Sequence, residues 1–360
     1  MANLQVLLAF VLSFSVVAIV TPLIRLLALR WKLGDKPNGR NLHTSTIPHL
    51  GGIGMVAGVV LTLVVIGRFF GFGETGSSFF YKLAVPVSLI VVLGLADDIR
   101  NLRARQKLTI QIIASTILAV SGVHLYLGFE TFDTNILAVI LLTSFYLVGT
   151  SSSVNLIDGH DGVAAGVSLI SAAAFAVLAW IVGASHLVVI ALALSGVCLG
   201  FLIYNFPPGR IFMGDAGSMF LGIVLGAVAC GLSMAQPAVT TFVAVCLVLA
   251  IPTLDALLAI ARRLFLRRPV FLADHQHIHH ILSSFGFTAR QTVVILYSLQ
   301  AVMACLGVLA MSGYVIPIVA GGVVFVLLFV GFFRLMVVAK QRSHTVSQDL
   351  SHGSVPSLEK

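Results

Sequence analysis

The segment NLIDGHDG at residues 155–162 brings acidic side chains into a strongly apolar chain. Asn155, Asp158 and Asp161 recur at a spacing of three, so one helical turn would put them on the same face. A glycine follows each aspartate and allows a ligand to approach the backbone closely. Carboxylates at the centre of a bilayer cost roughly 2.5–3.5 kcal/mol each, so we expect this segment at a membrane face. The alternative is a polar turn between helices, which explains one Asp-Gly pair better than two.

Two further segments hold carboxylates at the ends of apolar runs. LADDIR contains the adjacent Asp97 and Asp98, and IFMGDAG carries Asp215 where a helix is expected to start. A helix N-terminus has unpaired N–H groups and attracts phosphate. The simpler alternatives are that the adjacent acids mark the exit of a helix into water, and that Asp215 is an ordinary N-cap.

Histidines and turn-forming residues occur in two polar loops. The segment ADHQHIHH at residues 273–280 holds four histidines whose spacing also fits a zinc site, and the loop at 35–52 is rich in turn formers. Histidine and basic side chains donate hydrogen bonds to phosphate, whereas a plain connecting loop is the simpler interpretation of the second segment. The candidate substrate-binding residues, which include Asn155, are Asp35, Asn38, Arg40, His43, Lys107, Arg210, His277, His279 and His280.

The chain has 360 residues, of which 59% are hydrophobic and 9% charged. This composition is typical of a polytopic membrane protein and excludes a soluble globular enzyme. A spanning helix needs about 20 apolar residues, and eleven runs qualify, although some are short enough to leave ten as an alternative. We expect them near residues 4–24, 51–67, 81–96, 108–127, 135–152, 163–182, 186–204, 216–234, 238–258, 291–311 and 314–336. The predicted fold is all-α, with one transmembrane catalytic domain over 1–336 and a polar, disordered tail over 337–360.

Basic residues are distributed unequally between the two sets of loops that eleven spans create. Nineteen of the 21 Lys and Arg residues belong to one set, whereas the other set holds Arg68 and Lys82. By the positive-inside rule the richer set is cytoplasmic, which puts the N-terminus outside and the C-terminus inside. Eight aspartates and no glutamate lie at this same face ahead of the tail. We therefore expect the functional residues to face the cytosol.

Aspartates beside basic and histidine side chains indicate a particular chemistry. Carboxylate oxygens are preferred ligands of hard cations, so we predict Mg²⁺, with Mn²⁺ as the alternative. Cationic groups next to such an ion are typical of phosphoryl transfer. Two other classes remain open, a nucleotide-sugar or ion transporter and an intramembrane aspartyl protease suggested by the Gly-Asp pair at 214–215. We find no nucleic-acid-binding motif and interpret the net charge of +8 as an orientation signal.

Taken in order, these segments resemble the polyprenyl-phosphate N-acetylhexosamine-1-phosphate transferases. The matching stretches are DKPNGRNLH, LADDIR, NLIDGHDGVAAG, IFMGDAGSMFLG and DHQHIHHIL, which together span most of the chain. The last resembles the branch that uses UDP-N-acetylglucosamine, whereas our alternative, the branch acting on UDP-N-acetylmuramoyl-pentapeptide, carries a different histidine run. Two residues depart from the branch pattern, because His275 stands where arginine is usual and His160 where an aliphatic residue is usual.

The resemblance implies an enzyme of the bacterial plasma membrane that transfers N-acetylglucosamine-1-phosphate from UDP-N-acetylglucosamine to undecaprenyl phosphate and releases UMP. It also implies an initiating step of O-antigen, common-antigen or teichoic-acid synthesis. The oligomeric state stays open, with a homodimer among the alternatives. Asp97 is implied to accept a proton from the lipid phosphate or to orient it. The implied catalytic residues are Asp97, Asp98, Asp158, Asp161 and Asp215, and the implied metal ligands are Asp215, Asn155 and Asp98.

Overall fold

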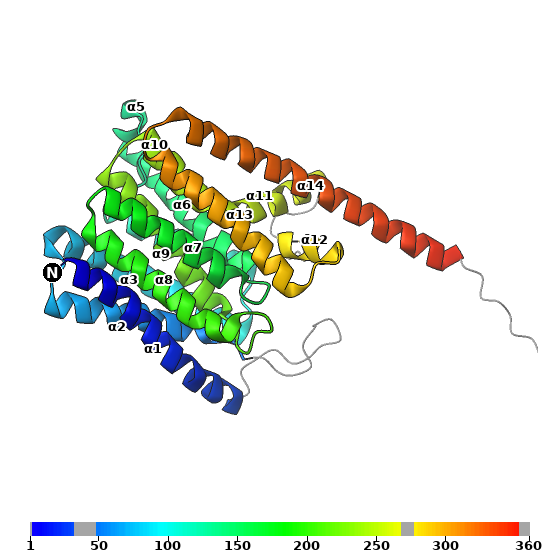
Figure 1. Cartoon of the computed structure of the whole chain (residues 1–360), viewed down its shortest axis with the longest axis horizontal. Helices are drawn as coiled ribbons and strands as arrows, with labels where there is room; N and C mark the ends of the chain where they lie inside the picture. The colour runs from blue at the N-terminus through cyan, green and yellow to red at the C-terminus, as the bar shows by residue number, and fades with distance from the viewer. Residues whose placement is uncertain (1, 32–47, 268–276, 353–360) are drawn as a thin grey trace, which may run out of the picture.

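The computed structural model describes residues 2–31, 48–267 and 277–352, and this part of the chain is helical with no strand (Figure 1). The described helices are α1 Ala2–Arg30, α2 Gly51–Phe69, α3 Gly73–Arg100, α4 Ala104–Val120, α5 Glu130–Asp133, α6 Ile136–Ile157, α7 Val163–Ile181, α8 Ser185–Asn205, α9 Gly214–Ala235, α10 Val239–Val248, α11 Ala250–Phe265, α12 Ile278–Ser284, α13 Ala289–Ala310 and α14 Val315–His352. The all-α prediction is confirmed.

The long helices lie side by side as a bundle of membrane spans (Figure 1). Within the described ranges, nine helices are long and apolar enough to cross a membrane, and α10 with α11 makes a tenth span if that bent pair is counted as one. Helix α4, with 17 residues, overlaps the predicted run at 108–127, which is the remaining one of the eleven, and packs against α3 and α6. The prediction of a multi-pass membrane protein with about eleven spans is therefore confirmed, and α4 accounts for the difference.

Helix α9 occupies the centre of the bundle. In the apolar stretch of α9, 89% of the residues are buried inside the protein. The corresponding shares are 22% in α1 and 11% in α14, which lie at the periphery. It contacts α2, α3, α6, α7, α8 and α10. Figure 1 shows α1 and α2 on one side of the bundle and α14 on the other. Asp215, in the first turn of α9, is thus carried by the most enclosed helix.

Small residues allow the start of α9 to lie close to α2 and α3. A Cβ added at Gly52 would lie 2.3 Å from the Cα of Gly217, and one added at Gly94 would lie 2.3 Å from the Cα of Ala216. The N–H of Gly52 also donates to the carbonyl of Met213 at 2.8 Å. Because no side chain fits between these backbones, the glycines fix the level at which α9 begins.

Helix α14 continues beyond the predicted domain limit at residue 336 and ends at His352. Residues 353–360 lie outside the described part of the chain. The division into a catalytic domain over 1–336 and a disordered tail over 337–360 stays a prediction.

We expect Gly52→Ala to destabilise the protein, because the added methyl group would meet backbone atoms of α9 that have no room to move. Overpacking of this kind typically costs about 1–3 kcal/mol, so the expected result is a lower Tm of the detergent-solubilised protein. Gly149→Ala on α6 is the matched control, since nothing lies within 4 Å of the Cβ that it adds. Equal Tm values for the two variants would contradict the close packing of α2 on α9.

Candidate active site

Three helices place a lysine between two carboxylates. Lys107, near the start of α4, donates from Nζ to Asp97 Oδ2 on α3 at 2.9 Å and to Asp215 Oδ2 on α9 at 2.7 Å. The other oxygen of Asp97 accepts from the N–H of Leu102 at 2.6 Å, within the turn between α3 and α4. The side chains of Asp97 and Asp215 are 10% and 25% exposed. The ammonium group therefore compensates negative charge that water reaches only in part.

Asp98 binds the N-terminus of α9. Its Oδ1 accepts from the N–H of Asp215 at 2.8 Å, and its Oδ2 accepts from the N–H of Ala216 at 3.3 Å. Gly214, with a φ of 75°, lies directly beside this carboxylate, and a Cβ there would be 2.7 Å from Asp98 Oδ2. The N-cap role considered for Asp215 is thus wrong, because a carboxylate from α3 serves the unpaired N–H groups instead.

The NLIDGHDG segment begins as helix and ends as a turn. Helix α6 ends at Ile157, so Asn155 is helical whereas Asp161 belongs to the turn before α7. The three polar residues therefore do not share one helix face, as their spacing had suggested. Asn155 Nδ2 donates to the hydroxyl of Ser218 on α9 at 2.9 Å. Asp161 Oδ2 accepts from the N–H of Gly209 at 2.8 Å, and its buried Oδ1 has no hydrogen-bond partner among the described residues.

Asp158 lies among the other carboxylates. Burial raises the pKa of its carboxyl group well above the usual value, and the negative charges of Asp215, Asp98 and Asp161 raise that pKa further. A raised pKa means that the ionised form is disfavoured. The Asp158 carboxyl group therefore keeps its proton more readily than a free carboxyl group does.

The histidine segment is held by an aspartate from α11. Asp255 Oδ2 lies 2.7 Å from His277 Nδ1, and Asp255 Oδ1 accepts from the N–H of Ile278 at 2.8 Å, which caps α12. The ring of His279 stacks on those of His160 and His277, with centroid separations of 5.4 and 5.8 Å. Its Nε2 is buried without a hydrogen-bond partner among the described residues.

The pKa of His279 is lowered to about 2. Burial is the main cause, and the neighbouring His280, His277 and His160 add to the effect. His279 is therefore neutral throughout the physiological pH range. A neutral imidazole has one donor nitrogen and one acceptor nitrogen, so the buried Nε2 can take part in a single hydrogen bond with a ligand.

Other polar residues, for which no role was predicted, connect the loops around the site. Asn205 Oδ1 accepts from the N–H of Gly162 at 2.9 Å, and its Nδ2 donates to the carbonyl of Ile211 at 2.9 Å. The hydroxyl of Tyr297 donates to the carbonyl of Gly162 at 2.6 Å. The signal that was available for Tyr297 and Asp255 is a polar side chain inside a predicted apolar run, and for Asn205 it is a polar side chain directly after one.

Not every predicted site residue joins this group. The side chain of Arg210 is exposed, and its backbone carbonyl accepts from Arg25 Nε at 3.0 Å. His280 is exposed beside His279, with 4.2 Å between ring centroids. The remaining predicted residues, which lie outside the described part of the chain, are Asp35, Asn38, Arg40, His43 and the departure at His275.

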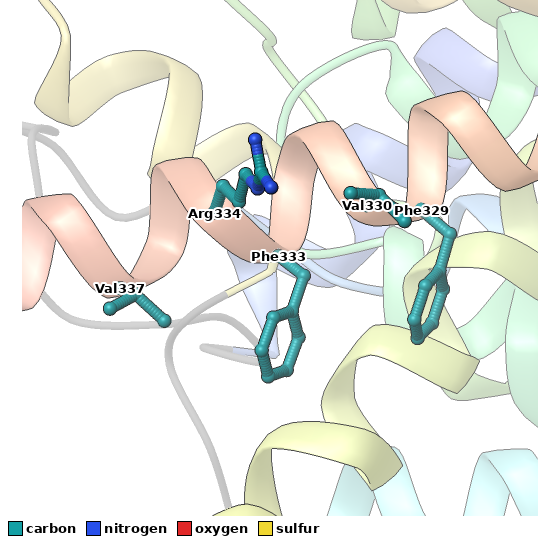
Figure 2. Close-up of a pocket in the computed structure, with 5 residues that line it drawn as sticks. All are labelled: Phe329, Val330, Phe333, Arg334 and Val337. Atoms are coloured by element: carbon teal, nitrogen blue, oxygen red, sulfur yellow. The ribbon is translucent and has the colours of Figure 1, made fainter.

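A separate apolar hollow of about 580 Å³ lies against α14 and is lined by Phe329, Val330, Phe333, Arg334 and Val337. Figure 2 shows the two phenylalanine rings on the same side of the helix and the guanidinium group of Arg334 on the opposite side. None of the clustered carboxylates or histidines lines this hollow. The polar groups, and not the hollow, therefore define the candidate active site.

Comparison with known proteins places this arrangement in a family. The model of glycosyl transferase family 4 matches residues 80–233, which include Asp97, Asp98, Asp158, Asp161 and Asp215. The chain is also 34% identical over 301 residues to the probable undecaprenyl-phosphate N-acetylglucosaminyl 1-phosphate transferase of Bacillus subtilis, with 82% of each chain covered. The chain belongs to glycosyl transferase family 4.

Two further transferases are also similar to this chain. The decaprenyl-phosphate N-acetylglucosaminephosphotransferase of Mycolicibacterium smegmatis is 33% identical over 311 residues, with 78% of this chain and 76% of the relative covered. The undecaprenyl-phosphate alpha-N-acetylglucosaminyl 1-phosphate transferase of Escherichia coli K12 is 30% identical over 319 residues, with 86% and 84% covered. The likeness of this family-4 chain to its relatives thus extends well beyond residues 80–233.

The cap on α9 predicts a difference between two variants of Asp98. Asp98→Ala removes both acceptors from the N-terminus of α9, and the loss of such a cap costs about 0.5–2 kcal/mol. We expect a lower Tm for this variant, whereas Asp98→Asn keeps one acceptor oxygen and loses less. Thermal unfolding in detergent measures both. Equal Tm values for Asp98→Ala and the wild type would contradict the capping role.

The low pKa of His279 predicts that acid destabilises the protein. Between about pH 2 and the usual histidine value near 6.5, the unfolded chain binds a proton at His279 that the folded protein does not bind. This residue's contribution to stability is therefore complete above about pH 6.5 and falls below it, by up to about 1.4 kcal/mol per pH unit. We expect the fall in Tm from pH 7.5 to pH 5 to be smaller in His279→Gln. The same fall in both proteins would contradict a neutral His279.

Proposed function

We propose that this chain transfers N-acetylglucosamine-1-phosphate from UDP-N-acetylglucosamine to undecaprenyl phosphate and releases UMP, as the initiating step of a cell-surface polysaccharide. The observation that carries the proposal is the convergence of carboxylates at one end of the bundle, where Asp97 and Asp98 of α3 and Asp215 of α9 meet Lys107 and the Asp158 turn after α6. A phosphoryl-transfer site needs such groups to position anionic substrates and to balance their charge. The names of the relatives in Bacillus, Mycolicibacterium and Escherichia support the sugar and the polyprenyl acceptor.

We propose that this end of the bundle faces the cytosol of a bacterial cell. Helices α1, α3 and α11 have Arg30, Arg100, Arg262 and Arg263 in their last turns. Lys and Arg are enriched in cytoplasmic loops, and UDP-sugars are cytosolic metabolites. The prediction that the N-terminus lies outside and the C-terminus inside follows from the same distribution.

In the proposed reaction an oxygen of the lipid phosphate attacks the β-phosphorus of the UDP-sugar. A P–O bond forms, the bond from that phosphorus to the bridging oxygen breaks, and UMP leaves with the electron pair. A phosphate monoester has a second pKa near 6, so much of the acceptor is already deprotonated at cytosolic pH. Asp97 then orients the acceptor more than it removes a proton. Lys107 has three donor hydrogens and uses two on carboxylates, which leaves one for a phosphate oxygen.

The residues present fit a magnesium ion that is shared with the substrate. No three His, Cys, Asp or Glu side chains in the described ranges form a metal cage by themselves. Mg²⁺, however, commonly binds through one or two carboxylates plus substrate phosphates. The neighbouring carboxylates of Asp98, Asp161 and Asp215 around Asp158, and the unpartnered Oδ1 of Asp161, favour such an ion. Asp215 and Asn155 are the proposed ligands, and the bound ion would neutralise charge on the leaving UMP. Both oxygens of Asp98 already bind α9, which makes it the weaker third candidate.

The histidine segment is the proposed contact for the diphosphate and the sugar. Asp255 fixes the orientation of His277, and the buried His279 offers one hydrogen-bonding nitrogen beside the turn that carries Asp161. Transfer to a pentapeptide-bearing donor is less favoured, because each relative described above is named for N-acetylglucosamine.

Transport and proteolysis are also less favoured by the geometry. A transporter needs polar groups near the bilayer midplane, whereas Asp97 and Asp98 lie in the last turn of α3 and Asp215 in the first turn of α9. An aspartyl protease needs two carboxylates that share a proton. Asp97 and Asp215 share the ammonium group of Lys107 instead.

The test is UMP release by purified protein with undecaprenyl phosphate, Mg²⁺ and UDP-N-acetylglucosamine. UDP-N-acetylgalactosamine and UDP-N-acetylmuramoyl-pentapeptide serve as competing donors. We expect release from the first donor, and a loss of roughly 100-fold or more in Asp215→Asn, because the variant loses the charged oxygen of a proposed ligand to the ion that would neutralise the leaving UMP. Glu130→Gln, an exposed acid in α5, is the control and keeps wild-type activity.

Release from another donor alone would overturn the assigned sugar and keep the chemistry. No release from any donor, in protein shown to be folded, would reject the transferase proposal. Release that persists after chelation of divalent ions would reject the proposed role of Mg²⁺.

A further inference from the structure

The span made by α10 and α11 is bent by 76° at Leu249. In a continuous helix the N–H of residue 252 would donate to the carbonyl of residue 248. Residue 252 is a proline, which has no N–H. The carbonyl of Val248 therefore needs a donor from another helix, because lipid offers no hydrogen bond to an unpaired backbone group.

Gln300 on α13 supplies this donor and also binds the other side of the break. Its Nε2 donates to the carbonyl of Val248 at 2.6 Å, and its Oε1 accepts from the N–H of Ile251 at 3.4 Å. Ser171 on α7 donates to the same carbonyl at 2.9 Å and accepts from Gln300 Nε2 at 2.9 Å. Both side chains are fully buried. One amide thus joins the last residue of α10 to the first turn of α11.

The direction of α11 determines where Asp255 lies. Asp255 is the sixth residue of α11, so it lies less than two turns after the break at Leu249. It is 2% exposed, and it binds His277 and the N–H of Ile278. His279, on the same short helix α12, stacks on His160 beside the Asp158–Asp161 turn. A continuous set of contacts therefore leads from Gln300 to the histidine segment.

We propose that Gln300 is a positioning residue of the candidate active site. By bonding to both sides of the break it sets the direction of α11, and through Asp255 it holds His277 and His279 in place. The kinetic part of this inference rests on the proposed function, whereas the structural part does not.

Two variants separate positioning from stability. Gln300→Leu removes both hydrogen bonds across the break. The double variant Gln300→Leu/Pro252→Ala also restores an N–H at residue 252, so Val248 regains a donor within the helix and α11 no longer needs the bend. Ser298→Ala, exposed on the same helix α13, is the matched control.

The first measurement is histidine modification by diethyl pyrocarbonate, followed by mass spectrometry. His277 and His279 are 8% and 2% exposed, and the exposed His280 is the internal reference. We expect both variants to raise the modification of His277 and His279 relative to His280 by about tenfold, which corresponds to a modest loss of protection. The control variant is expected to match the wild type.

The second measurement is a comparison of KM values. We expect both variants to raise the KM for UDP-N-acetylglucosamine about tenfold and the KM for undecaprenyl phosphate by less than about twofold. A purely structural role would lower the active fraction, and thus kcat, without this difference between substrates. The Tm of the double variant is expected to be close to that of the wild type.

Wild-type histidine protection in Gln300→Leu would overturn the proposal. A double variant with restored Tm, normal protection and normal KM values would also overturn it, because Gln300 would then serve stability alone. If Gln300→Leu fails to fold, the double variant decides. If the wild type releases no UMP, the proposed function fails, while histidine modification still decides whether Gln300 positions the segment.

Discussion

The site depends on positive charge placed between carboxylates that would otherwise repel one another. Asp97 and Asp215 come from helices that are more than one hundred residues apart, and the ammonium group of Lys107 lies between them. Asp98 receives the backbone N–H groups at the start of α9, where the helix dipole adds partial positive charge. Burial, and then the negative charges of Asp215, Asp98 and Asp161, raises the pKa of Asp158. Lys107 and the start of α9 are therefore the positive groups that allow these carboxylates to lie close together.

The packing of α9 makes this charge arrangement possible. Lipid chains are as apolar as leucine, so helices in a membrane associate through close packing more than through the hydrophobic effect. Gly52 and Gly94 allow the backbones of α2 and α3 to reach the first turn of α9. The same closeness puts the carboxylate of Asp98 within hydrogen-bond distance of that turn. The glycines and Asp98 therefore act together: the glycines allow the close approach of the helices, and Asp98 binds the first turn of α9.

Much of this arrangement was predictable from the sequence. The lengths of the apolar runs predicted the helices. Because successive spans cross the membrane in opposite directions, the positions of the acidic segments along the chain predicted that they lie at one end of the bundle. The partners were not predictable, because they depend on how distant helices pack. Asp98 caps a helix 117 residues further along the chain. The spacing of Asn155, Asp158 and Asp161 suggested one helix face, but the Asp-Gly sequence ends α6 at Ile157 and turns the chain.

The partners of Asp255 and Gln300 were also not predictable from the sequence. Each is a polar residue in an apolar run, which signals a buried partner without identifying it. Pro252 gave a stronger signal, because a proline inside a predicted span requires some other group to serve the carbonyl four residues before it. Only the packing of α13 against α10 and α11 identifies that group as Gln300.

The central place of α9 has a consequence for how the protein tolerates different membranes. Bilayers differ in thickness, and a spanning helix in contact with lipid adjusts by tilting or by local distortion. The helices that meet the lipid most are peripheral, with α1 and α14 the least buried, whereas α9 is enclosed by protein over most of its length. The outer helices are therefore the ones that tilt or distort when the bilayer thickness does not match their length. The carboxylates around the start of α9 therefore keep their spacing in bilayers of different thickness, because the helix that carries this site has little contact with lipid.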